Sequence, residues 1–128
     1  RWLLYAALVN GRRDVYARSV QADGRGPWQI SPSGGSQPAW RADGKEVFYI
    51  AANGTMTAVP VEVAGDDLRP GTPTALFPTE MTLRRGAARD YDVTPDGKRF
   101  LLALPQSAAH AEAPITVIIN WPKLLEKR

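Results

Sequence analysis

The sequence predicts an all-β fold, and three observations support this prediction. Asp43-Gly44 separates two runs rich in aromatic and β-branched residues, which is a strong short-range signal for a β-hairpin. The same pattern returns around Asp96-Gly97. Glycine and proline number 11 each and lie between the apolar runs, as turn residues do in all-β chains, and no segment has the long 3.6-residue apolar period of a helix.

The recurring pattern indicates an internal repeat. Pro38–Ile50 and Tyr91–Leu104 share the same turn, and Arg1–Tyr5 aligns with Lys45–Tyr49 as a third copy that lacks its Asp-Gly. Arg1 and Lys45 occupy matching positions 44 residues apart, and Lys45 and Lys98 occupy matching positions 53 residues apart. These offsets fit propeller blades of about 40–50 residues, the second with an inserted loop. We therefore predict a partial β-propeller of antiparallel four-stranded blades, of which about two and a half are present.

The first unit, residues 1–36, is predicted to be an incomplete blade. Trp2–Leu8 is apolar at every position, which is typical of a strand covered on both faces. Asn10-Gly11 turns it into a return strand at Asp14–Val20, whose alternation predicts one partly solvated face. Pro27–Ile30 is predicted to be a short edge strand, and Ser31–Ser36 a flexible link.

The second unit, residues 37–89, is predicted to be a full blade with a loop. Asn53-Gly54 turns its second strand into its third, and Pro60 predicts a bulge or an unpaired site within the third. Ala64–Gly71 and Pro78–Arg89 are predicted to be loops. The four strands expected are Gln37–Arg41, Glu46–Ala51, Thr55–Val63 and Thr74–Phe77.

The last unit, residues 90–128, is predicted to be an incomplete blade followed by a charged tail, Lys123–Arg128, that is too short to form a stable helix alone. Its expected strands are Asp90–Val93, Arg99–Leu104 and Ile115–Trp121, with a loop at Pro105–Pro114. Because incomplete blades leave strand edges unpaired, we expect the chain to self-associate through them.

These residues resemble a known family. Trp28–Ser31, Gly34–Trp40, Asp43–Tyr49 and Tyr91–Gly97 are similar to the TolB-type, WD40-like β-propeller repeats of bacteria. The likeness is greatest to the carboxy-terminal propeller behind eukaryotic-like serine/threonine kinase domains and winged-helix regulators. Asp43 departs from the repeat, because it follows Ala42 where the family has proline.

The resemblance implies a sensory or protein-binding module. It also implies a membrane-anchored bacterial protein with the propeller on its periplasmic or extracytoplasmic side, although the sequence itself leaves the compartment open. The kinase motifs are absent from the sequence: it has no glycine-rich phosphate loop, no His-Arg-Asp and no Asp-Phe-Gly.

The sequence offers few candidates for catalysis or metal binding. We interpret the aspartates of Asp43-Gly44 and Asp96-Gly97 as turn residues, and the adjacent Asp66-Asp67 as a pair that solvates a loop. His110, the only histidine, lies in an alanine-rich stretch and is interpreted as an exposed loop residue. No Gly-x-Ser-x-Gly motif occurs. We therefore predict no catalytic residue, no metal and no cofactor.

Arg84, Arg85 and Arg89 are the nearest approach to a basic patch, and they form a possible loop for binding an acidic partner. A solvated loop is the alternative. The net charge of +3 is too small to indicate nucleic acid unless it is clustered. No apolar stretch reaches the length of a membrane span. The four tryptophans are expected to pack between neighbouring blades, with a binding groove as the alternative: Trp2, Trp28, Trp40 and Trp121.

The function expected from these features is non-catalytic binding of a protein or a small ligand. The chain would be the sensory or scaffolding part of a bacterial kinase-like or regulator protein. One alternative is a propeller accessory domain that gates substrate access to a serine peptidase, and another is a purely structural piece. An upstream kinase or winged-helix domain would favour the first reading, and a downstream hydrolase the second. The end of the chain at Arg128 resembles the natural end of such kinases and regulators.

Overall fold

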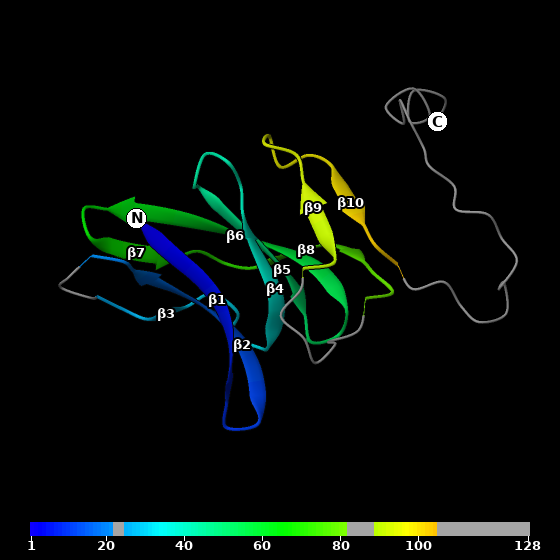
Figure 1. Ribbon diagram of the computed structural model, residues 1–128, viewed down its shortest axis with the longest axis horizontal. Coiled ribbons are helices and arrows are strands. Elements are labelled where there is room, and N and C mark those ends of the chain that lie inside the picture. The colour runs from blue at the N-terminus through cyan, green and yellow to red at the C-terminus, as the bar shows by residue number, and fades with distance from the viewer. Residues whose placement is uncertain (22–24, 82–88, 105–128) are drawn as a thin grey trace, which may run out of the picture.

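A computed structural model describes residues 1–21, 25–81 and 89–104, and within these ranges the chain forms ten strands and no helix (Figure 1). Every strand pairing is antiparallel. The predicted all-β class is confirmed. The strands form three sheets. The predicted strand Ile115–Trp121 and loop Pro105–Pro114 lie outside the described residues.

The first sheet contains β1 (Trp2–Val9), β2 (Arg12–Ser19) and β3 (Trp28–Gln29), in the order β1-β2-β3. Asn10 and Gly11 join β1 to β2, and both have positive φ angles, 51° and 80°. Two such residues make the two-residue turn whose twist suits a hairpin, which explains the continuous register from Trp2–Ser19 to Val9–Arg12.

The strand β1 is covered on one face only, so the prediction from its apolar run was wrong. On the outward face, Leu3 is 53% exposed and Val9 is 42% exposed. The reason is that no sheet of the described chain packs on the outward face of β1. Leu4 points the other way and packs against the core between the first and second sheets. An apolar run therefore marks a strand without telling how many of its faces are covered.

The segment Ser31–Ser36, predicted to be a flexible link, is buried at residue 31 and over residues 34–36, and only Pro32 and Ser33 are exposed. The hydroxyl oxygen of Ser31 is buried, accepts a hydrogen bond from the backbone N–H of Val15 (2.8 Å) and donates to Asp14 Oδ1 (3.5 Å). A Cβ on Gly35 would come within 2.6 Å of the Tyr49 ring. Small residues are needed here because backbone and ring approach closely, so a composition typical of linkers reflects tight packing instead.

The second sheet contains β4 (Gly35–Trp40), β5 (Glu46–Ala51), β6 (Thr55–Ala64), β7 (Asp67–Pro70) and β8 (Thr74–Pro78). β5 coincides with the predicted strand. β7 lies in the segment predicted to be a loop, and that prediction was wrong.

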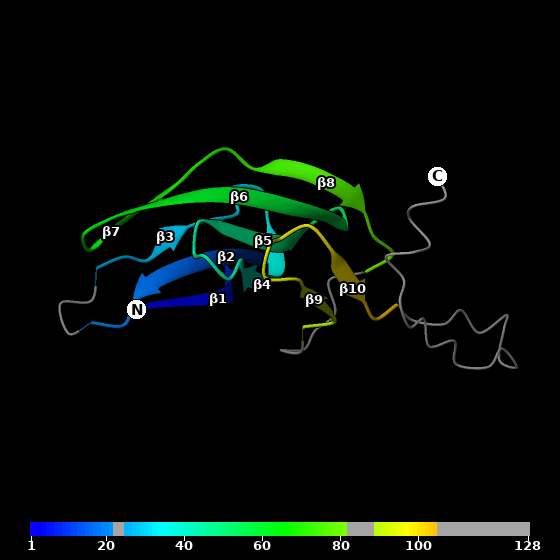
Figure 2. The same ribbon diagram turned by 90° about the horizontal axis from the view of Figure 1, so that it is seen from above.

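The strands β7 and β8 are two parts of one return strand along the edge of β6 that is opposite β5. Val61 N donates to Lys45 O on the β5 side, whereas Pro60 O accepts from Gly71 N on the other side (2.8 and 2.7 Å). Figure 2 shows β7 and β8 beside the two ends of the long strand β6. The central sheet is thus a four-stranded meander with a broken last strand, and the break falls opposite Pro60.

The polar composition of residues 64–71 is the reason that β7 was predicted to be part of a loop. Leu68 is buried in the core between the first and second sheets, while Arg69 beside it is exposed. Asp66 does not simply solvate a loop, because it forms an ion pair with Arg1 of the first sheet's end (2.6 Å). One buried leucine and the pairing with β6 thus hold a short strand whose other residues are polar or partly exposed.

The third sheet contains β9 (Tyr91–Val93) and β10 (Phe100–Leu102). The second sheet lies between the first and the third, and its two faces form two cores (Figure 1). On β5, alternation places Val47 and Tyr49 in the core with the first sheet, and Phe48 and Ile50 in the core with the third. The three sheets therefore stack face to face.

The turns at Asp43-Gly44 and Asp96-Gly97 make the same hydrogen bonds. The N–H of the glycine donates to the carbonyl three residues earlier, at 2.9 Å in Gly44 and 2.8 Å in Gly97. The aspartate oxygen accepts from the N–H two residues later, at 3.0 Å in both. The glycine φ angles are 70° and 72°. One kind of turn thus joins β4 to β5 in the second sheet and β9 to β10 in the third, 53 residues apart.

Candidate binding surface

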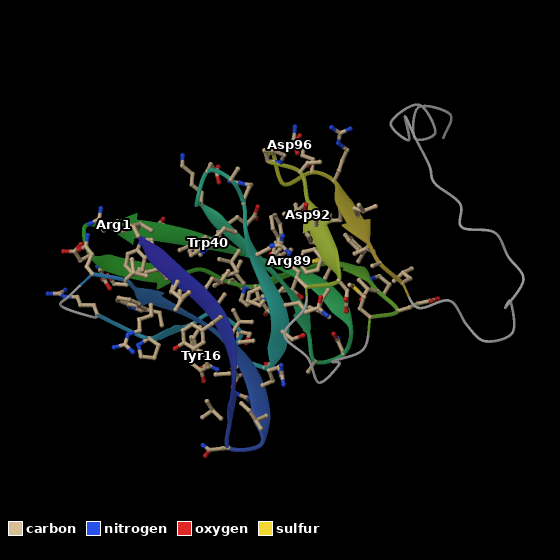
Figure 3. All side chains as sticks on the ribbon, viewed as in Figure 1. Arg1, Tyr16, Trp40, Arg89, Asp92 and Asp96 are labelled. Atoms are coloured by element: carbon tan, nitrogen blue, oxygen red, sulfur yellow. The ribbon has the colours of Figure 1, made fainter. Side chains whose placement is uncertain are left out.

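A surface hollow of about 570 Å³ lies on the third sheet. Its lining combines a cation, two carboxylates and apolar side chains: Arg89, Asp90, Tyr91, Asp92, Leu101 and Ala103. Figure 3 shows Arg89 and Asp92 beside β9. Such a mixed lining suits contact with a polar peptide or a small ligand.

Strand alternation decides which side chains face the hollow. Phe100 and Leu102 of β10 pack toward the second sheet, whereas Leu101 points away from it and is 75% exposed. Leu101 lies directly opposite Asp92 of β9 in the register. The outward face of the third sheet therefore presents a large apolar side chain next to a carboxylate.

The charges at the rim are paired only weakly. Arg89 Nη2 donates to Asp92 Oδ1 at 3.1 Å, and both side chains are largely exposed. The Arg89 guanidinium carbon also lies 5.7 Å from the centre of the Tyr91 ring. Exposed pairs of this kind contribute about 0–1 kcal/mol, so the arginine can exchange its partner at little cost.

One wall of the hollow is tied to the second sheet. The backbone N–H of Asp90 donates to Gln37 Oε1 (2.8 Å), and Gln37 Nε2 donates to Asp90 Oδ2 (3.3 Å). Gln37 has a φ of 52° and lies where the β4–β5 register shifts between Ser36 and Ala39. The irregular backbone there directs the glutamine side chain across to the next sheet.

Tyr91 offers the hollow no reactive hydroxyl, because its side chain is buried in the core between the second and third sheets. Its O–H donates to the backbone oxygen of Phe48 at 3.2 Å in a buried position. Burial raises the pKa of Tyr91 far above its ordinary value of 10.0, so the group stays protonated. In the described residues, no three His, Cys, Asp or Glu side chains are grouped so that they could hold a metal ion.

Of the arginines predicted for partner binding, Arg89 lies in the hollow, whereas Arg84 and Arg85 lie outside the described residues. His110 and Trp121 also lie outside them. The turn residues Asn53 and Gly54 join β5 to β6: Gly54 N donates to Ala51 O, and Asn53 Oδ1 accepts from Thr55 N.

The other tryptophans pack inside. Trp2 and Trp28 meet edge to face with ring centres 5.3 Å apart, and both pack with Trp40 against the core between the first and second sheets. Packing between neighbouring units is therefore their role in this structure.

Asp43 and Asp96 lie in their turns. The hydrogen bond from Arg41 and then the N–H of Lys45 lower the pKa of Asp43 to about 2.

A second outward face lies at the opposite side of the stack, on β1 and β2. Tyr5 and Tyr16 are register partners whose rings stack with centres 5.9 Å apart. Leu3, half exposed, lies opposite the exposed Arg18 in the same register. This face presents an apolar side chain next to a positive charge, whereas the outward face of the third sheet presents one next to a negative charge.

Sequence reasoning missed Gln37, Asp92 and Leu101. Asp92 and Gln37 carry no motif. Leu101 could have been placed on the same face of its unit as Phe48, because the 53-residue offset aligns the two residues.

A search with this chain found no matching family model, no matching curated protein and no matching solved structure. In the described ranges, no helix has the length and apolar character needed to cross a membrane.

Proposed function

We propose that this chain is a non-catalytic binding module, built as part of a TolB-type bacterial β-propeller, which contacts a protein or small ligand through the hollow on the third sheet. The observation that carries the proposal is the pair of Asp-Gly turns with the same hydrogen bonds, 53 residues apart, each of which joins the first two strands of one of two stacked sheets. Blades that stack face to face are the architecture such repeats build.

The alignment of the faces supports the same proposal. With offsets of 44 and 53 residues, Leu3, Val47 and Phe100 occupy equivalent positions. Val47 packs toward the first sheet and Phe100 toward the second, so both face the preceding unit. One direction of stacking along the chain is what successive propeller blades require.

As part of a propeller, the module would be the sensory or scaffolding portion of a kinase-like or regulator protein, on the extracytoplasmic side of a membrane. The rival function is a propeller domain that gates access to a serine peptidase. The coding sequence on either side decides between them: a kinase or winged-helix domain before this segment supports the first, and a hydrolase domain after it supports the second.

Selection of short random peptides displayed on phage tests the binding role of the hollow. We expect peptides selected on the full chain to bind a Leu101→Glu, Arg89→Glu double variant about ten- to a hundredfold more weakly, because an apolar contact and a charge contact are lost together. The control is Leu76→Glu, an exposed leucine on β8 away from the hollow. Equal binding to the double variant, or no selected peptide, would contradict the proposal.

A further inference from the structure

Within residues 1–21, 25–81 and 89–104, the stack of sheets has two outward faces that no other sheet covers. We define the leading face of a unit as the one turned toward the preceding sheet, and the trailing face as the one turned toward the following sheet. The first sheet leaves its leading face open, with Leu3 and Tyr5 on it. The third sheet has no described sheet on its trailing face, which carries Leu101 and the hollow.

Both interfaces inside the molecule join a trailing face to a leading face. Leu4 and Phe48 occupy equivalent trailing positions, 44 residues apart. Leu4 packs into the core that contains the leading residue Val47. Phe48 meets the leading residue Phe100 edge to face, with ring centres 5.1 Å apart. The open trailing residue Leu101 therefore matches a leading residue such as Leu3.

The charges beside these two leucines are opposite. Arg18 is the register partner of Leu3, and Asp92 is the register partner of Leu101. The present partner of Asp92 is the exposed Arg89, an ion pair that costs little to exchange. The stacked rings of Tyr5 and Tyr16 stand beside Leu3, and a hollow lies beside Leu101. The two faces thus carry opposite charges beside an exposed leucine.

We propose that the occupant of the trailing face is a second copy of this chain, which docks by its leading face. Leu3 of one copy meets Leu101 of the other, and Arg18 meets Asp92. The contact joins two different surfaces, so it is heterologous, and repetition gives a ring where the rotation closes. The inference rests on the proposed function, because it names the partner of the same hollow.

The test uses two variants that block one face each. Leu3→Glu blocks the leading face, and Leu101→Glu blocks the trailing face. Both positions are exposed, and folding is checked by circular dichroism. Sedimentation velocity over a range of concentrations should show association of the unaltered chain, a shift of about ten- to a hundredfold toward monomer for each variant alone, and a one-to-one dimer when the two variants are mixed.

The mixing result separates this contact from others. In a symmetric contact, the variant with the intact trailing face would still dimerise by itself. The control Leu76→Glu should associate like the unaltered chain. A monomeric unaltered chain, self-association of either variant as strong as that of the unaltered chain, or a mixture no more associated than each variant alone overturns the proposal. If glutamate unfolds either variant, Leu3→Ser and Leu101→Ser serve in the same design.

Failure here and failure of the proposed function can be told apart. A chain that stays monomeric but yields peptides sensitive to Leu101→Glu loses this inference and keeps its binding role. A chain that associates as described, but yields no such peptide, keeps the inference, and the hollow then serves only contact between copies. Association through strand edges would persist in both variants and would also overturn the inference.

Discussion

Gln37 and Asp90, 53 residues apart, hold each other through two hydrogen bonds between the second and third sheets. Asp90 N donates to Gln37 Oε1 at 2.8 Å, and Gln37 Nε2 donates to Asp90 Oδ2 at 3.3 Å. The separation equals the repeat offset, so the two residues have equivalent places in successive units. This contact fixes the third sheet, and with it the hollow, against the second.

Replacing Gln37 tests that contact. Gln37→Ala removes both bonds and keeps a non-glycine residue at a φ of 52°, so we expect a loss of about 1–3 kcal/mol in the free energy of unfolding. Gln37→Gly removes the same bonds but relieves the backbone, and it should be about 1 kcal/mol more stable than the alanine variant. Urea unfolding measures both, and an alanine variant as stable as the parent contradicts the assignment.

The glycines of the two Asp-Gly turns form a matched pair. Gly44 and Gly97 share their φ angles and hydrogen bonds, but only a Cβ on Gly97 meets neighbours, Arg41 Cδ at 2.7 Å and Phe48 Cζ at 3.1 Å. Gly44→Ala should cost about 1–2 kcal/mol from the left-handed backbone. Gly97→Ala should cost roughly 1–3 kcal/mol more, because it also overpacks the contact between sheets.

Equal losses in the two glycine variants would show that the turn at 97 does not lie against the second sheet. Urea unfolding with an unchanged m-value is the appropriate measurement, since a changed m-value signals a change in the exposed surface instead.

The turn at Asp43 predicts a pH dependence. Hydrogen bonds from Arg41 and from the N–H of Lys45 lower the pKa of Asp43 from 3.8 to about 2. Because the folded-state pKa is the lower one, the ionised carboxylate adds stability above the unfolded-state value, and this is lost as the pH falls toward 2. The melting temperature of Asp43→Asn should be below that of the parent at neutral pH, and the difference should shrink between about pH 4 and 2.

Asp96 should behave in the same direction, since the Thr94 hydroxyl and then the Lys98 N–H lower its pKa. A difference in melting temperature that stays constant down to pH 2 would mean that the turn carboxylates do not owe their pKa to these bonds.

Local pattern predicted the elements that depend on local chemistry. The strand Glu46–Ala51 and its flanking turns follow from apolar residues and glycines that lie next to each other in the sequence. Stacking of the sheets was expected from the repeat. The two segments that composition predicted wrongly depend on distant residues. Ser31 is held by Asp14 and Val15, and β7 packs against the core between the first and second sheets, to which it contributes only Leu68.

The candidate surface was less predictable. Arg89 stood out as one of three neighbouring arginines, but its partners Tyr91 and Asp92 are recognised only when β9 is placed. Leu3 and Leu101 are exposed because they lie on the outer sheets of the described stack, and nothing in a leucine reveals whether a further sheet covers it.

The central claim is that the units stack face to face, and the three phenylalanines of the chain test it most directly. Phe100 of the third sheet has its ring centre 5.1 Å from that of Phe48 and 5.4 Å from that of Phe77, both in the second sheet. With isotope labels on phenylalanine rings only, a nuclear Overhauser spectrum of the full chain should show cross-peaks from Phe100 to both other rings, assigned through Phe100→Leu. A folded, well-resolved spectrum in which Phe100 has no cross-peak to either ring would contradict the stack.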